Sequence, residues 1–181
     1  LRFTAGDAQA LDEPAASRDL VVSALALNFM ADRGKALAEM RRVLRPGGTM
    51  AFYVWDYPGG GVQFMRAFWS AAIALDPSAR DLAEDRRFPF CTAEALLDAV
   101  AAAGFLAAEC QAIEAPSVFA DFDDYWRPFT LGAGPAPGYC TKLDPDARER
   151  LRVSLAAALP READGSIALT VRAWAIKARA P

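Results

Sequence analysis

Two apolar runs flank an amphipathic segment in the first third of the chain. Residues 19–26 and 49–55 are largely aliphatic or aromatic, whereas residues 32–44 repeat apolar side chains at helical spacing. This order predicts a strand, a helix and a second strand. Because the helix carries the chain back, the two strands are expected to be parallel. Strands this apolar are typical of a sheet covered by helices on both faces.

The amphipathic segment carries its own start and stop signals. Asp32 can cap a helix, because its carboxylate accepts an N–H that the first turn leaves unpaired. Pro46 and Gly47 stop the helix, and Arg45 suits the negative end of its dipole. The remaining positions separate into an apolar stripe and an outward face, namely Ala36, Leu37, Met40, Val43 and Leu44 against Glu39, Arg41 and Arg42.

The rest of the chain predicts further elements on both sides of this unit. Residues 1–5 are expected to be the end of a strand, and Thr92 and Asp121 are suitable helix caps. The later elements are, in order, a helix over 62–75, a charged loop over 76–89, a helix from 93 to Gly104, a strand over 105–119 broken at Pro116, a short helix over 122–130, a loop over 131–139, a helix over 145–159 and a strand over 166–178. We expect helical insertions at about 58–90 and 121–160 in one domain.

Composition narrows the classes of partner. The chain has 181 residues, 54% of them hydrophobic, which is enough for a domain with its own core. A net charge of −3 disfavours nucleic acid or an anionic membrane as partner, and no apolar stretch is long enough to cross a bilayer. Cys91, Cys110 and Cys140 match neither a disulfide framework nor a zinc site, which is typical of a cytoplasmic protein. The chain has no histidine, so we expect no metal site.

Three short segments follow one another within about fifty residues. They are Gly6-Asp7-Ala8-Gln9-Ala10-Leu11, Arg18-Asp19-Leu20-Val21-Val22-Ser23 and the run from Ala36 to Gly48. In this order they resemble class I S-adenosylmethionine-dependent methyltransferases. The likeness is closest to the small-molecule branch that includes the C-methyltransferases of ubiquinone and menaquinone biosynthesis, and it is specific only within residues 6–56. It implies an α/β fold with a doubly wound, mostly parallel sheet and helices on both faces.

The family's glycine-rich turn and its ribose-binding acid do not occur in this sequence. The resemblance therefore implies that residues 1–181 are the C-terminal part of a single methyltransferase domain. At least two strand–helix units, roughly 70–100 residues at about 30 each, are expected upstream. Their strands would lie between the strand at 1–5 and the strand at 19–26, which otherwise has a bare apolar edge. The chain alone is then expected to be inactive.

The resemblance also implies where the cofactor, S-adenosylmethionine, would bind. Asp7 matches the acid that accepts a hydrogen bond from the adenine amino group, and Ala8 matches the neighbour whose N–H meets an adenine ring nitrogen. Ser23 and Ala24 match positions that line the methionine part, and Leu25 lies beside them. On the residues alone, Asp7 could instead cap a turn, and the Ser23 hydroxyl could satisfy local backbone.

The methyl acceptor is less well defined. Asn28 and Phe29 occupy a place where many relatives carry two His or His-Trp, and either packing or a pocket would explain them. Asp56 or Tyr57 could assist deprotonation. An apolar acceptor pocket could be built from Trp55, Phe64, Phe68 and Trp126, although such aromatics more often form the core.

These residues favour one function over two alternatives. Methyl transfer needs alignment more than acid–base groups, so the lack of histidine is compatible with it. We expect methyl transfer to a small, hydrophobic or planar molecule, and a homodimer is compatible with this. The alternatives are a degenerate, non-catalytic methyltransferase-like binding domain and a nucleotide-binding oxidoreductase of similar topology.

Overall fold

Two units, each with its own core, form the part of the chain that the computed structural model describes, residues 3–181. Unit 1 consists of the described residues up to Asp56, together with Phe90–Ile113 and Ala173–Pro181. Unit 2 consists of Tyr57–Pro89 and Glu114–Arg172.

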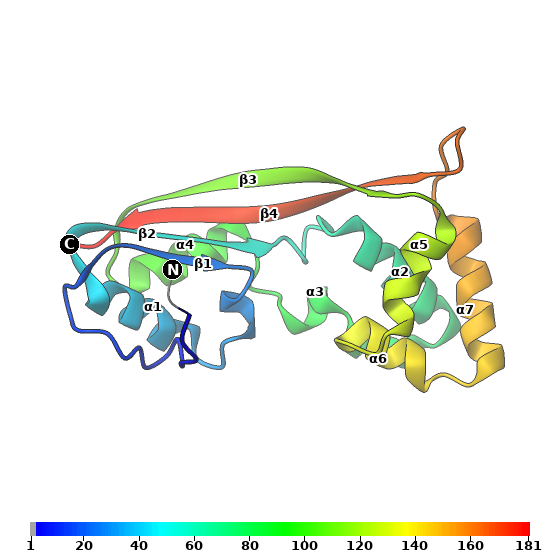
Figure 1. Ribbon diagram of the computed structural model, residues 1–181, viewed down its shortest axis with the longest axis horizontal. Helices are drawn as coiled ribbons and strands as arrows, with labels where there is room; N and C mark the ends of the chain where they lie inside the picture. Colours follow the sequence, from blue (N-terminus) through cyan, green and yellow to red (C-terminus); the bar gives the residue numbers. More distant parts are fainter. Residues whose placement is uncertain (1–2) are drawn as a thin grey trace. The chain divides into compact units, whose positions relative to one another are not determined.

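A four-stranded sheet has the order β1-β2-β4-β3 (Figure 1). β1 pairs with β2 in parallel, and β2 pairs with β4 antiparallel. The predicted α/β class and the parallel pairing of the first two strands are confirmed, but the predicted mostly parallel sheet is wrong, because this sheet is mixed. The bounds of the strands are β1 Arg18–Ala24, β2 Leu44–Trp55, β3 Leu106–Phe119 and β4 Ile167–Arg179.

The antiparallel pairing follows from where β4 begins. The segment after β2 already pairs with β4, because the Arg172 N–H donates to the Gly61 carbonyl at 2.7 Å and Val62 bridges to Val171. β4 therefore starts beside the segment by which the chain leaves β2. It runs back along β2 until Arg179 lies opposite Thr49.

In unit 1, α1 (Arg33–Val43) and α4 (Ala93–Ala102) lie on the same face of the sheet (Figure 1). Both predicted caps are confirmed: Asp32 accepts from the Lys35 N–H at 2.9 Å, and Thr92 accepts from the Ala95 N–H at 3.3 Å. The short helix η1 (Leu27–Phe29) follows β1.

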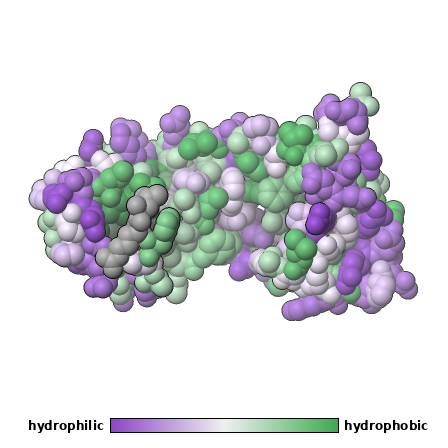
Figure 2. All heavy atoms as spheres, in the orientation of Figure 1, coloured by the Kyte–Doolittle hydropathy of each residue, from purple (hydrophilic) through white to green (hydrophobic). Residues whose placement is uncertain are grey.

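The other face of the β1 end of the sheet is not covered by any described helix. Leu20 and Val22 are 57% and 59% exposed. The space-filling view shows hydrophobic side chains at the surface among polar ones (Figure 2). The prediction of helices on both faces is therefore wrong for residues 3–181, since α1 and α4 both pack on one side.

Unit 2 is helical around a core of aromatic side chains. The Phe68 ring stacks on Phe129 with centroids 4.4 Å apart, and Tyr125 is fully buried. The elements are α2 Gln63–Leu75, η2 Pro77–Leu82, α3 Glu84–Arg87, α5 Phe122–Trp126, η3 Arg127–Thr130, α6 Pro135–Lys142 and α7 Pro145–Ala158.

Several local predictions differ from the structure. The loop predicted over 131–139 contains the start of α6, because Pro135 occupies the first turn, where a helix needs no N–H. β3 runs through Pro116 without a break, since β3 is an edge strand and an edge tolerates a residue without an N–H. Residues 3–5 are not a strand, and residues 1–2 of that prediction lie outside the described residues. The loop predicted over 76–89 contains η2 and α3.

Candidate functional site

The carboxyl ends of β1 and β2 form the candidate site in unit 1. The Ser23 side chain is 8% exposed and lies opposite Phe52 of β2. The Leu25 N–H extends the pairing to the Tyr53 carbonyl at 2.9 Å, and Leu25 has a φ of 51°. A left-handed backbone at a residue with a Cβ is unfavourable and is over-represented at functional sites. Ligands of parallel sheets bind at this edge.

Asn28 is the most unusual residue at this edge. It lies in η1, directly after β1, and is only 3% exposed. Neither its Nδ2 nor its Oδ1 has a hydrogen-bond partner among residues 3–181. Native proteins pair nearly all buried polar groups, and leaving one unpaired costs about 1–3 kcal/mol. The unpaired amide therefore indicates that a polar partner from outside the described residues belongs here.

Asp56 and Cys91 are buried where β2 ends and where α4 is about to begin. Asp56 is 1% exposed. Burial raises the pKa of the Cys91 thiol to about 12, with Asp56 adding to the shift and Arg33 opposing it. Cys91 is therefore a protonated thiol at neutral pH, which excludes a thiolate nucleophile at this position.

Asp7 forms a tight turn in the loop before β1. Its Oδ1 accepts from the Gln9 N–H at 2.8 Å and from Gln9 Nε2 at 3.3 Å. These hydrogen bonds hold the pKa of Asp7 below its ordinary value, so the carboxylate is ionised at neutral pH. The turn-capping alternative is confirmed as a geometry. It leaves Oδ2, which accepts no hydrogen bond from residues 3–181, free for another donor.

Gln9 connects this turn to the start of α1. Its Oε1 accepts from the backbone N–H of Asp32, the N-cap of α1, at 2.7 Å. The loop that carries Asp7 and Ala8 is therefore attached to α1 at its N-terminal end.

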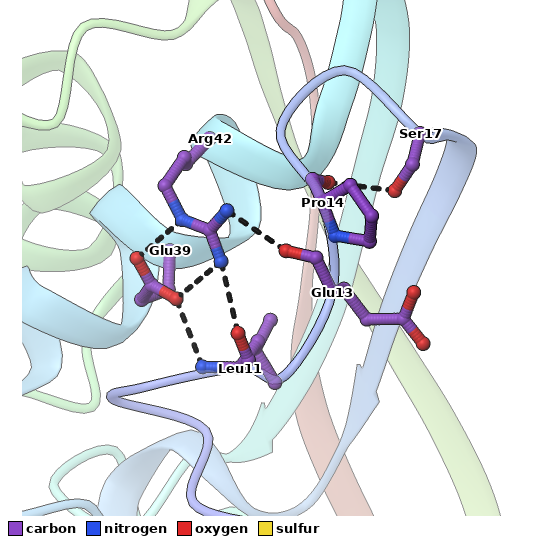
Figure 3. A network of polar contacts seen from close by, with 6 residues as sticks. All are labelled: Leu11, Glu13, Pro14, Ser17, Glu39 and Arg42. Atoms are coloured by element: carbon purple, nitrogen blue, oxygen red, sulfur yellow. Dashed lines mark hydrogen bonds and ion pairs between the residues drawn. The ribbon is translucent and has the colours of Figure 1, made fainter.

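A second attachment holds the same loop near the other end of α1 (Figure 3). Arg42 donates to both carboxylate oxygens of Glu39, and also to the carbonyls of Leu11 at 3.0 Å and Glu13 at 2.8 Å. Glu39 in turn accepts from the Leu11 N–H at 2.8 Å. We call this set of contacts the Arg42 clamp. The helical pattern predicts only that Glu39 and Arg42 face outward, because it does not reveal which loop lies over that face.

The Arg42 clamp predicts a pH dependence in strong acid. The hydrogen bond from Arg42 lowers the pKa of Glu39 to about 2 from 4.5. A carboxyl whose pKa is lower in the folded state stabilises the protein above its unfolded pKa, and this contribution is lost as pH falls toward the folded pKa. We therefore expect the amide proton of Leu11 to titrate with a midpoint near pH 2, measured by NMR chemical shift.

Arg42→Gln is the matched control for this titration. Without the guanidinium, the Leu11 midpoint should rise toward 4.5, the ordinary value for a glutamate. A midpoint near 4.5 in the unsubstituted protein would show that the clamp does not form in solution.

The residues predicted to contact substrate fall in both units. In unit 1, Phe29 is 64% exposed and Trp55 is half-buried at the end of β2. In unit 2, Phe68 is fully buried and Trp126 is 8% exposed, both in the aromatic core. Phe64 lines a cavity of about 380 Å³. For Phe68 and Trp126 the structure supplies a packing role, and their contact with substrate stays a prediction.

That apolar cavity of unit 2 lies between α2, the end of β3 and the segment from α5 to α6. Its walls are almost entirely apolar, and the Tyr125 hydroxyl donates to the Phe64 carbonyl at 2.8 Å, so this polar atom is already paired. The lining includes Phe64, Phe119, Tyr125, Phe129, Pro135 and Pro137. A cavity of this size and lining fits a small hydrophobic molecule.

Neither a metal cluster nor a membrane-spanning helix occurs in the described part of the chain. Among residues 3–181, no three Cys, Asp or Glu side chains gather in a way that could hold a metal ion. In the same part of the chain, no helix combines the length and apolarity needed to cross a membrane.

Comparison with known sequences places the likeness in the N-terminal part. Residues 1–52 match the family model described as a methyltransferase domain. A demethylmenaquinone methyltransferase of Deinococcus radiodurans is 42% identical over 62 residues, which is 34% of this chain and 26% of that protein. A malonyl-[acyl-carrier protein] O-methyltransferase of Pseudescherichia vulneris is 35% identical over 83 residues, which is 46% of this chain and 32% of that protein. The matches thus span a third or less of either relative.

Solved structures extend the likeness of fold to the whole chain. A Bacillus halodurans protein assigned as a methyltransferase matches 100% of this chain and 78% of its own, at 15% identity and a TM-score of 0.58. The YcgJ protein of Bacillus subtilis matches 98% of this chain and 70% of its own, at 18% identity and a TM-score of 0.55. At such low identity these matches establish the fold alone.

Proposed function

We propose that this chain, whose residues 1–52 match the family model described as a methyltransferase domain, takes part in methyl transfer from S-adenosylmethionine to a small, hydrophobic or planar molecule. The observation that carries the proposal is the buried Asn28 amide, unpaired among the described residues, at the carboxyl ends of a parallel strand pair. This is the edge at which α/β sheets bind ligands.

The residues of this edge fit the cofactor. Oδ2 of the ionised Asp7 is open to accept the adenine amino group, and the backbone N–H of Ala8 would meet an adenine ring nitrogen. Ser23, Ala24 and Leu25 would line its methionine part. When bound, the cofactor supplies a methyl group already activated by the positive charge on sulfur. The protein's task is then to hold and align, which can supply about 7–11 kcal/mol of barrier reduction.

Two positions next to this edge would serve the acceptor. The Asn28 amide offers one donor and one acceptor to a polar group, and Phe29 offers an exposed apolar ring beside it. Asp56 is the nearest candidate base by sequence, since it directly follows β2.

Titration of the complete gene product with S-adenosylhomocysteine tests the proposal. Asp7→Ala should weaken binding by about 5–150-fold, since a cofactor amino group left without its acceptor costs about 1–3 kcal/mol. Asp12→Ala is the matched control, because Asp12 is an exposed acid of the same loop, and it should leave affinity unchanged.

Asp7→Asn separates cofactor contact from the shape of the turn. Asparagine keeps one oxygen for the Gln9 N–H but replaces Oδ2 by an amide nitrogen. We expect it to bind as weakly as Asp7→Ala, and full binding by Asp7→Asn would reduce Asp7 to a turn former. If the unsubstituted protein does not bind S-adenosylhomocysteine, the proposal fails and the non-catalytic alternative is favoured.

A further inference from the structure

A second cavity of unit 2 combines an apolar wall with charged groups. It measures about 340 Å³ and lies between the turn at residues 57–60 and the elements α2, η2 and α3. We call it the glycine-loop cavity. Its lining includes Gly60, Met65, Arg66, Trp69, Ile73 and Glu84. We propose that the glycine-loop cavity is a binding site for a small organic carboxylate with an apolar body, a role that does not depend on the cofactor.

Arg66 is the group that would bind the carboxylate. No acidic side chain of the described residues 3–181 forms an ion pair with it, whereas Arg80, on the same cavity, pairs with Asp85 at 2.7 Å. A guanidinium presents a planar fork of donors that matches a carboxylate with two parallel hydrogen bonds. Its charge is therefore available to a ligand.

Gly60 makes room for this guanidinium. A Cβ placed on Gly60 would lie 2.8 Å from Nη1 of Arg66, so the guanidinium packs directly against the bare backbone of the turn. Gly60 also has a φ of 69°, and its N–H donates to the Tyr57 carbonyl at 3.1 Å. A glycine at this point thus both closes the turn and leaves the space that Arg66 fills.

The apolar wall lies on α2 beside Arg66. Met65, Trp69 and Ile73 follow one another at intervals of four residues, so they share one face of the helix. The Trp69 indole N–H donates to Oε2 of the buried Glu84, which fixes the ring against the wall. A ligand would place its apolar body on this wall and its anionic group on Arg66.

The acidic side chains of the cavity favour a carboxylate over a phosphate. Asp85 is already matched by Arg80, which leaves Glu84 as the group that an anion would meet. Burial raises the pKa of Glu84, and its Oε2 is covered by the indole, so its repulsion of a single negative charge is reduced. A phosphate would bring a second charge for which the cavity has no unpaired cation besides Arg66 among the described residues.

Binding of hexanoate, followed by NMR, tests the proposal. Hexanoate should shift the indole N–H resonance of Trp69 saturably, and Arg66→Gln should weaken binding by roughly 10–150-fold, as for a lost charge-assisted hydrogen bond. Arg86→Gln is the matched control, because Arg86 is an exposed arginine of α3 that does not line the cavity. Equal loss in both variants would overturn the assignment to Arg66.

A glycine pair and two further probes complete the test. Gly60→Ala should abolish the shift by displacing the guanidinium, whereas Gly165→Ala, whose φ of 89° brings similar strain into open space, should not. Hexanamide has the same apolar body without the charge and should bind at least about tenfold more weakly. Equal binding of hexanamide, or a Trp69 shift with inorganic phosphate but none with hexanoate, would overturn the proposal.

Discussion

Phe68→Ala will lower the free energy of unfolding of unit 2 by about 3–5 kcal/mol, a large share of the roughly 5–15 kcal/mol that stabilises an ordinary domain. The Phe68 side chain is fully buried and its ring stacks on Phe129 with centroids 4.4 Å apart. It also makes edge contacts with Trp69 and Tyr139, at 5.2 Å and 6.4 Å. Removing the ring leaves a cavity that these rings cannot close without losing their own contacts. Urea denaturation followed by circular dichroism measures the loss.

Leu131→Ala is the matched control for this substitution. Leu131 is a large apolar residue of the same unit but is 69% exposed, so its loss should change stability by no more than about 0.5 kcal/mol. If Phe68→Ala leaves stability unchanged and removes ligand binding, Phe68 contacts substrate as the sequence predicted, and the packing role given to it here is wrong.

Asn28→Leu, in contrast to Phe68→Ala, should raise the free energy of unfolding. Leucine has a similar size and removes the unpaired donor and acceptor from a position that is 3% exposed, so the ligand-free chain should gain about 1–3 kcal/mol. The same substitution should weaken the binding of S-adenosylhomocysteine or of the methyl acceptor, because the amide is the group that would meet them. Stability that rises while binding falls is the signature of a residue retained for function.

Asn28→Ala separates the loss of the amide from the gain of packing. It removes the same unpaired atoms but leaves a void, so it should not reach the stability of Asn28→Leu. A fall in stability for Asn28→Leu would show that the amide already has a partner in the folded chain, and the argument from an unpaired group would fail.

Elements governed by local signals could be predicted from the sequence. Asp32, Thr92 and Asp121 each accept from a backbone N–H three residues ahead, as a cap does, and their helices begin where these residues predict. The strand–helix–strand unit over 19–55 was predictable for the same reason, because its periodicity lies within the segment itself. Its internal boundary differs from the prediction, since α1 ends at Val43 and β2 begins at Leu44, before the predicted stop at Pro46.

Features set by distant residues could not be predicted. The antiparallel direction of β4 depends on where the chain re-enters the sheet after unit 2, which no pattern within β4 encodes. The helix α6 was mistaken for a loop because Gly134 and Pro135 are also turn residues, and only the structure shows that they start a helix.

The features of the candidate site likewise divide into local ones, which could be predicted from the sequence, and ones set by distant residues, which could not. The turn at Asp7 is local, and turn capping was one of the two roles predicted for this residue. The Arg42 clamp joins residues separated by as many as 31 positions, so its existence depended on knowing that the loop lies over α1. The lack of hydrogen-bond partners for Asn28 depends on the residues that surround it in the fold, so its sequence position is compatible with both packing and a pocket.

Pro116 has a consequence for association between molecules. It lies within β3, the outermost strand on its side of the described sheet, and it has no N–H to offer. An incoming strand that paired along this edge would lose a hydrogen bond in the middle of the ladder. Pro116 therefore does not break β3, but it hinders a strand of another molecule from pairing along the free edge of β3. In this way it protects that edge of the sheet against growth into fibrils.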